Sequence, residues 1–137
     1  MIAGIGVDIV DVVGFRAQLA DPASSFVHGT FTAGEQADAK QRPSRDSARH
    51  LAARYAAKEA FIKAWSGSRW DQEPVLQHID MRDIEVVCDR HGRPKLTLHG
   101  ALRRAVEMTT GASPRHHLSL SHDGEAAVAY VVLEKSV

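Results

Sequence analysis

The sequence predicts an α+β fold in which a small, mostly antiparallel sheet packs against one long helix. Three observations predict it. An alternating strand opens the chain, an alanine-rich segment without internal glycine or proline follows, and two strand pairs with short turns occupy the second half. We expect one domain over residues 1–137, because this length is typical of a single domain and is enough to bury a core.

The composition is that of a globular protein and argues against several classes of function. Hydrophobic residues make up 44% of the chain, and 17 basic residues balance 17 acidic ones. The chain therefore lacks the overall positive field that favours nucleic acid. A single cysteine, Cys88, excludes an intrachain disulfide and fits a reducing compartment, so we expect a cytoplasmic protein. Because no signal peptide or apolar run of about 18 residues is visible, no membrane partner is expected.

Residues 2–10 alternate with a period of two and predict the first strand. One face carries branched apolar residues: Ile5, Val7 and Ile9. The other face carries two glycines and a carboxylate: Gly4, Gly6 and Asp8. Glycine inside a strand often marks the close approach of a ligand or of another backbone. Asp8 could therefore be a magnesium ligand, or it could be an ordinary aspartate near the end of a strand.

Two short helices are predicted next. The first covers residues 11–20. The second covers residues 32–40, because Thr32 and Glu35 have the spacing of a capping box. A polar break follows at residues 41–47.

The longest predicted helix runs from Ser44 to about Trp65. At about 100° per residue, small and apolar side chains gather on one side of it: Ala48, Ala52, Tyr55, Ala56 and Ile62. Glu59 lies in the middle of that side, with Lys63 beside it. A charge on such a face is costly unless it is paired or bound to a metal. The two residues could form a functional site, or only an ion pair along the helix worth about 0.2–0.5 kcal/mol.

The second half of the chain predicts two hairpins and one helix. Residues 68–82 are expected to form a loop, and the helix covers residues 100–110. The strands are expected at residues 84–88, 95–98, 116–121 and 126–133. Asp123-Gly124 is expected to form the turn of the second hairpin.

The tip of the second hairpin carries Ser121, His122 and Asp123 in succession. These residues cannot easily form a catalytic triad, because consecutive strand residues point to opposite faces. His122 could contact a phosphate together with N–H groups of the turn, or it could be a turn histidine in solvent. The other histidines, including His50, show no metal-ligand spacing and are expected to be surface or structural residues.

Taken together, the motifs resemble the short holo-acyl-carrier-protein synthase family within the phosphopantetheinyl transferase superfamily. They occur in family order over nearly the whole chain: Ile5-Gly6-Val7-Asp8-Ile9-Val10, Phe31-Thr32 with Glu35, Arg54 to Ala64, Asp83-Ile84-Glu85-Val86, Gly92-Arg93-Pro94, and Leu118-Ser119-Leu120-Ser121-His122. The resemblance implies a 4′-phosphopantetheinyl transferase-like fold. It also implies transfer of the 4′-phosphopantetheine group of coenzyme A to a serine of an apo acyl carrier protein or carrier domain. The reaction would release 3′,5′-ADP and serve fatty acid or polyketide synthesis.

The resemblance also implies roles for individual residues. Asp8 and Glu59 would bind Mg²⁺ together with the diphosphate of coenzyme A, and Lys63 would lie near those phosphates. Arg54 and His122 would hold the nucleotide end, including its 3′-phosphate. The expected coenzyme A contacts are Arg54, Lys63, Gly67, Gly92, Pro94 and His122. The family pattern further implies a homotrimer with sites between neighbouring subunits.

These residue types suit the implied reaction. Attack by a serine hydroxyl on phosphorus builds charge on phosphate oxygens, which magnesium and Lys63 would offset. Glu59, directly or through a metal-bound water, is the candidate proton acceptor, so Glu59 and Lys63 are the expected catalytic residues. We expect the glycine face around Asp8 and the alanine face around Glu59 to leave room for the diphosphate.

One feature departs from the family pattern. Members that act on free-standing acidic carrier proteins usually carry several basic residues on the first helix, whereas residues 11–20 hold only Arg16. Docking of an acidic partner should be weaker here. We hypothesise that the carrier is a domain of a large fatty acid or polyketide synthase, where local concentration replaces affinity.

Two other functions remain open. A magnesium-dependent phosphohydrolase acting on coenzyme A or a nucleotide diphosphate would use Asp8, Glu59 and Lys63 equally well. A non-catalytic carrier-binding module would have no need of these three residues. Rapid release of 3′,5′-ADP without a carrier would indicate the hydrolase, and carrier binding without transfer would indicate the module.

Overall fold

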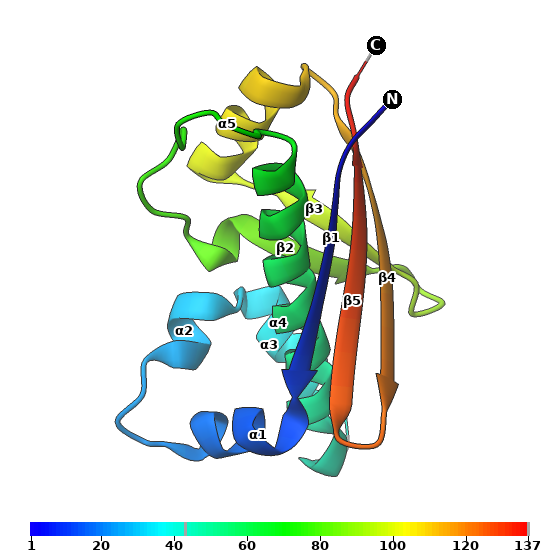
Figure 1. Cartoon of the computed structure of the whole chain (residues 1–137). Helices are drawn as coiled ribbons and strands as arrows, with labels where there is room; N and C mark the ends of the chain where they lie inside the picture. Colours follow the sequence, from blue (N-terminus) through cyan, green and yellow to red (C-terminus); the bar gives the residue numbers. More distant parts are fainter. Residues whose placement is uncertain (43, 137) are drawn as a thin grey trace.

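The computed structural model describes residues 1–42 and 44–136 and has the expected α+β fold (Figure 1). The elements, in chain order, are β1 (Ile2–Asp11), α1 (Val12–Ala20), α2 (Phe26–Thr30), α3 (Ala33–Lys40), α4 (Ser44–Gly67), the 3₁₀ turn η1 (Met81–Asp83), β2 (Ile84–Cys88), β3 (Pro94–Leu98), α5 (Gly100–Thr110), β4 (Arg115–Asp123) and β5 (Ala126–Glu134). In the described part of the chain, no helix is both long enough and apolar enough to cross a membrane.

The strands form two antiparallel sheets rather than one. The larger sheet has the order β1-β5-β4, so that β1 and β4 are its opposite edges, and β2 pairs with β3 separately. In the larger sheet, Asp8 of β1 lies opposite Ala129 of β5, and Ala129 lies opposite Leu120 of β4. Side chains alternate between the two faces of a sheet. Asp8 and Leu120 therefore project toward α4, which packs against this face.

The two glycines of β1 allow the backbone of α4 to approach the strand. A Cβ atom on Gly4 would lie 1.9 Å from the carbonyl oxygen of Ala64, and one on Gly6 would lie 1.8 Å from that of Ala60. The expectation that this face leaves room for a diphosphate is therefore wrong, because the helix fills it. The alanine face of α4 also leaves no space for a ligand, because it packs against the sheet and Ala56 and Ala60 are fully buried.

A buried polar network fixes α4 to its neighbours. Lys58 donates from Nζ to Glu35 Oε1 at 2.7 Å and to the carbonyl oxygens of Met81 and Ile84. Glu35 also accepts the backbone N–H of Val86, and the side chains of both charged residues are completely buried. Because burial of a charge is costly without partners, these bonds hold α3, α4 and β2 in one fixed arrangement.

The predicted elements differ from the structure in a few places. The capping box of Thr32 and Glu35 is confirmed, but α2 was not predicted, because its five residues are too few to show a helical period. Asp123 belongs to β4, where it pairs with Ala126. The turn is therefore at Gly124 and Glu125, and Gly124 adopts a φ of 55°.

Candidate functional site

Asp8 and Lys63 meet where β1 crosses α4. Lys63 donates hydrogen bonds from Nζ to Asp8 Oδ1 at 3.0 Å and to the carbonyl oxygen of Val7 at 3.1 Å. The side chain of Lys63 is 54% exposed and that of Asp8 is 16% exposed. The pair is therefore open on the lysine side and accessible to a charged ligand.

Glu59 lies beside this pair and contacts Tyr55. Burial, the charge of Glu59, a hydrogen bond with Glu59 and the charge of Asp8 together raise the pKa of the Tyr55 hydroxyl. Because the charges of both carboxylates raise the pKa of the same hydroxyl, Asp8 and Glu59 both lie near Tyr55, on one side of α4. We call Asp8, Tyr55, Glu59 and Lys63 the carboxylate cluster. Among the described residues, Lys63 forms an ion pair with Asp8 and not with Glu59. An ion pair between Glu59 and Lys63 along the helix therefore does not explain why these two charged residues lie on this face.

The carboxylate cluster offers the donor atoms that magnesium prefers. Mg²⁺ is commonly bound through one or two carboxylates, and phosphate oxygens and water supply its remaining ligands. Asp8 and Glu59 provide two such carboxylates on a partly exposed surface. Across residues 1–42 and 44–136, no group of three or more histidine, cysteine or acidic side chains could hold a metal. The residues therefore fit a magnesium ion that is shared with a substrate, and they do not fit a closed structural metal site.

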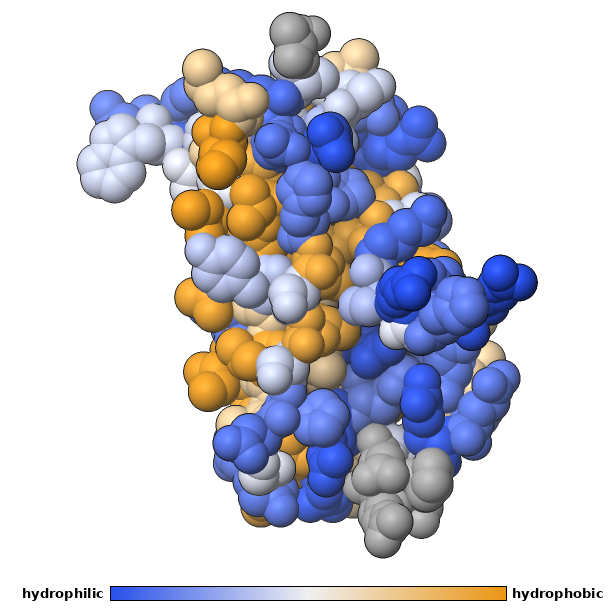
Figure 2. All heavy atoms as spheres, turned by 90° about the vertical axis from the view of Figure 1, so that its right-hand side faces the viewer, coloured by the Kyte–Doolittle hydropathy of each residue, from blue (hydrophilic) through white to orange (hydrophobic). Residues whose placement is uncertain are grey.

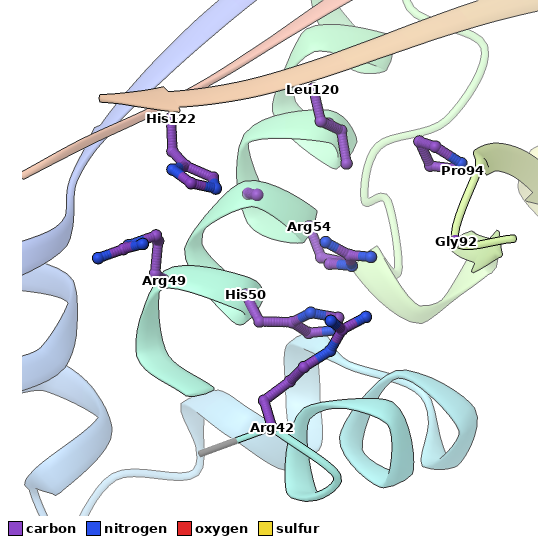
Figure 3. Close-up of a pocket in the computed structure, with 9 residues that line it drawn as sticks. Arg42, Arg49, His50, Arg54, Gly92, Pro94, Leu120 and His122 are labelled. Carbon is purple, nitrogen blue, oxygen red and sulfur yellow. The ribbon is translucent and has the colours of Figure 1, made fainter. Parts of the chain in front are cut away.

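A second group of predicted residues lines a basic cavity of about 420 Å³ (Figure 3). We call it the basic pocket. Its lining residues are Arg42, Arg49, His50, Ala53, Arg54, Gly92, Pro94, Leu120 and His122. No carboxylate is among them in the part of the chain that the structure describes. Guanidinium groups attract phosphate, so the pocket is suited to an anionic ligand.

Three elements position the predicted residues of the basic pocket. His122 projects from β4 toward α4, whereas the adjacent Ser121 points to the other face, as expected from strand geometry. Arg54 projects from α4 and donates from Nη2 to Cys88 Sγ at 3.2 Å. Gly92 has a φ of 78°, a conformation that favours glycine, and it lies in the turn between β2 and β3.

Three basic or titratable lining residues were not predicted, namely Arg42, Arg49 and His50, and neither were the apolar Ala53 and Leu120. His50 and Arg54 are four residues apart and therefore share one side of α4, a spacing that could have indicated His50. Burial, followed by the charges of Arg54 and Arg42, lowers the pKa of His50 to about 4. Arg42 follows α3 and reaches the pocket only through tertiary packing, so no local pattern could have indicated it.

Gly67, which the resemblance placed among the coenzyme A contacts, lies elsewhere. It is the last residue of α4 and is exposed, and it is not among the residues that line the basic pocket. Its contact with coenzyme A remains a prediction.

The carboxylate cluster and the basic pocket face different sides of the chain. Arg54 and Glu59 are five residues apart, which turns their directions by about 140° around the helix. Asp8 and His122 lie on β1 and β4, the opposite edges of the sheet. One chain therefore does not bring the carboxylate cluster and the basic pocket together.

The chain is similar to known proteins over nearly its whole length. Residues 4–131 match the family model of the 4′-phosphopantetheinyl transferase superfamily. The chain is 47% identical over 135 residues to the holo-(acyl-carrier-protein) synthase of Mycobacterium ulcerans, covering 98% of each chain. Among solved structures it resembles the acyl carrier protein synthase–coenzyme A complex of Chronobacterium ammoniagenes, with a TM-score of 0.89, 38% identity and 98% of each chain covered. It also resembles the acyl carrier protein synthase of Mycobacterium tuberculosis, with a TM-score of 0.78, 43% identity and coverage of 99% and 100%.

Proposed function

The chain belongs to the 4′-phosphopantetheinyl transferase superfamily and to its holo-(acyl-carrier-protein) synthase family, and on that premise we propose how its residues act. The enzyme transfers the 4′-phosphopantetheine group of coenzyme A to a serine of an apo acyl carrier protein or carrier domain, in fatty acid or polyketide synthesis. The reaction depends on Mg²⁺ and releases 3′,5′-ADP, and the whole of residues 1–137 forms one catalytic domain. The observation that carries this proposal is the combination of a carboxylate cluster with a separate basic pocket.

In this proposal the basic pocket holds the nucleotide end of coenzyme A. Arg54 and His122 bind its phosphate groups, and Gly92 and Pro94 form the wall that the nucleoside contacts. Support comes from the cavity itself, because cationic and polar side chains line it and no described lining residue is acidic. A nucleotide with several phosphates is the part of coenzyme A that matches this lining.

The carboxylate cluster acts on the diphosphate. Magnesium held by Asp8 and Glu59 would offset the negative charge of the diphosphate oxygens. Lys63 leaves Asp8 to contact the same oxygens. Glu59 accepts the proton of the carrier serine while the serine oxygen forms a bond to the phosphorus that bears pantetheine. The bond from that phosphorus to the oxygen of the nucleotide phosphate breaks, and 3′,5′-ADP leaves with the electron pair.

The two halves of the site meet between subunits of a homotrimer. Within one chain Glu59 and Arg54 point to different sides of α4, so a diphosphate held by Glu59 requires a basic pocket from a neighbouring chain. The outer face of the larger sheet offers a surface for assembly, since it exposes four apolar side chains: Ile5, Val7, Ile9 and Tyr130. Figure 2 shows apolar side chains gathered in a band on the sheet side of the molecule. Exposed apolar patches of this kind mark interaction surfaces.

The carrier is proposed to be a domain of a large synthase. Arg16, the one basic residue of α1, lies 4.0 Å from Glu125 and is partly neutralised by it. The helix therefore offers little positive charge to a free-standing acidic carrier.

Mass spectrometry of an apo-carrier tests the proposal. The carrier is incubated with coenzyme A, Mg²⁺ and the protein, and a gain of one phosphopantetheine group on serine is expected. Release of 3′,5′-ADP without a carrier would indicate a phosphohydrolase instead. Binding of the carrier without any mass gain would indicate a non-catalytic module. A faster reaction on a free carrier protein than on an excised synthase domain would contradict the proposed choice of carrier.

A further inference from the structure

His50 is buried in the wall of the basic pocket with a hydrogen-bonding atom left unused. The residue is 9% exposed, and its Nε2 atom has no partner among the described residues. An unpaired buried polar atom costs about 1–3 kcal/mol, and native proteins rarely keep one without a reason. The position of this atom beside an open cavity suggests that a ligand supplies the missing partner.

The neighbours of His50 determine what kind of partner suits it. Burial and the charges of Arg54 and Arg42 hold the pKa of His50 at about 4, so the imidazole is neutral near pH 7. A neutral ring can donate or accept one hydrogen bond at Nε2 but adds no charge. The adjacent arginines already offer charge to phosphate. His50 is therefore suited to an uncharged group of the ligand.

The cavity around His50 is large enough for a nucleoside. A second cavity, of about 390 Å³, adjoins the basic pocket and shares Arg42, His50 and Gly92 with it. Figure 3 shows the guanidinium of Arg42 beside the His50 ring. Because the Arg42 side chain is exposed, it can move away from the ring at little cost when a phosphate attracts it.

We propose that His50 is a specificity residue, which hydrogen-bonds through Nε2 to an uncharged polar group of the nucleoside of coenzyme A after Arg42 moves aside. This inference rests on the proposed function, since it concerns the nucleotide end of the same substrate. The uncharged group is a base nitrogen or the ribose 2′-hydroxyl.

Calorimetric titration of 3′,5′-ADP into His50→Leu, His50→Gln and His50→Asn tests the inference. Gln places its amide near the position of Nε2, whereas the shorter Asn does not reach it. Loss of one hydrogen bond weakens binding about 3–10-fold in the Leu and Asn variants, and Gln keeps affinity close to that of the unchanged protein. The Leu variant should unfold at the same temperature or higher, because it removes an unpaired buried atom. Equal affinity in all four proteins, or in the Gln and Asn variants, overturns the inference.

Two further ligands identify the group that His50 contacts. The first ligand is 3′-dephospho-coenzyme A, which lacks the 3′-phosphate. If His50→Leu still binds it more weakly than the unchanged protein does, the partner of His50 is uncharged, as proposed. If the two proteins bind it equally, His50 contacts the 3′-phosphate and the inference is overturned. The second ligand is 2′-deoxy-3′,5′-ADP, which lacks the ribose 2′-hydroxyl. If the difference in affinity between His50→Leu and the unchanged protein disappears with this ligand, His50 contacts the hydroxyl; if the difference remains, His50 contacts the base. Transfer to an apo-carrier by the unchanged protein is measured in parallel. Failure of that reaction rejects the proposed function, whereas unchanged binding by the variants rejects only the role of His50.

Discussion

Lys63 and Asp8 form a hydrogen-bonded ion pair at 3.0 Å, although they are 55 positions apart in the sequence. The pair joins α4 to β1 and places a cation against one of the two carboxylates proposed to hold magnesium. We therefore expect Asp8→Asn and Glu59→Gln each to lower phosphopantetheine transfer by about 100-fold or more, because each removes charge from the reacting centre. Initial rates of 3′,5′-ADP release with a carrier, measured over a range of Mg²⁺ concentrations, check this.

The control for these variants is Glu73→Gln, which removes the charge of an exposed carboxylate in the loop after α4. It should leave the transfer rate within about twofold. Melting temperatures of all three variants should stay within about 2 °C of the unchanged protein. Near-normal transfer by Asp8→Asn or Glu59→Gln would remove that residue from the proposed metal site.

Gly6 is expected to be indispensable for folding. A methyl group there would lie 1.8 Å from the Ala60 carbonyl oxygen, and this backbone atom can move only if the whole helix moves. We expect Gly6→Ala to lower the free energy of unfolding by about 3 kcal/mol or more. Gly29→Ala, where a Cβ atom meets nothing within 4 Å, is the matched control and should be neutral or stabilising. Urea denaturation measures both, and equal stability of the two variants would contradict the close packing.

The contrast between Gly6 and His50 shows how far the sequence could be interpreted. Alternation, capping-box spacing and an alanine-rich helix are local patterns, so they predicted the main elements and aligned Asp8 with the glycine face. The glycines were equally compatible with a ligand and with a second backbone, and only the packing of α4 decided between them. Arg42 joins the site through long-range packing, which leaves no periodic trace in the sequence. His50 lies four residues before Arg54 on α4, so this spacing was the one local signal for it.

Lys58 should matter for stability rather than for chemistry. Burial lowers the pKa of its ammonium group, and the charge of Glu35 opposes that shift. Lys58→Met leaves Glu35 buried without a cation, so a loss of about 3–5 kcal/mol in the free energy of unfolding is expected. The double variant Lys58→Met with Glu35→Gln should recover part of it. The exposed Lys95→Met is the control, and a loss of similar size there would show that the buried pair is not the cause.

Mixed oligomers test whether the site is shared between subunits. Asp8→Asn and Arg54→Ala damage different halves of the site, so a co-expressed mixture of equal amounts should form intact sites at about a quarter of the interfaces. Activity should return to that fraction, although each variant alone is inactive. A mixture of Asp8→Asn with Glu59→Gln should not recover, because both residues belong to one carboxylate cluster. Recovery in neither mixture would indicate that each chain contains its own complete site.

His50 should make the stability of the protein depend on pH. Its pKa falls from 6.5 in the unfolded chain to about 4 in the fold, so between these values the unfolded chain binds more protons. The contribution of His50 to the free energy of unfolding is therefore fully present above pH 6.5 and is lost as the pH falls toward 4. At pH 5 this amounts to about 2 kcal/mol. Urea denaturation at pH 7 and at pH 5 measures how much free energy of unfolding is lost between the two pH values. This loss should be about 2 kcal/mol smaller in His50→Leu than in the unchanged protein. An equal loss in both would mean that the pKa of His50 does not fall when the chain folds, which would contradict the burial of its ring between the arginines.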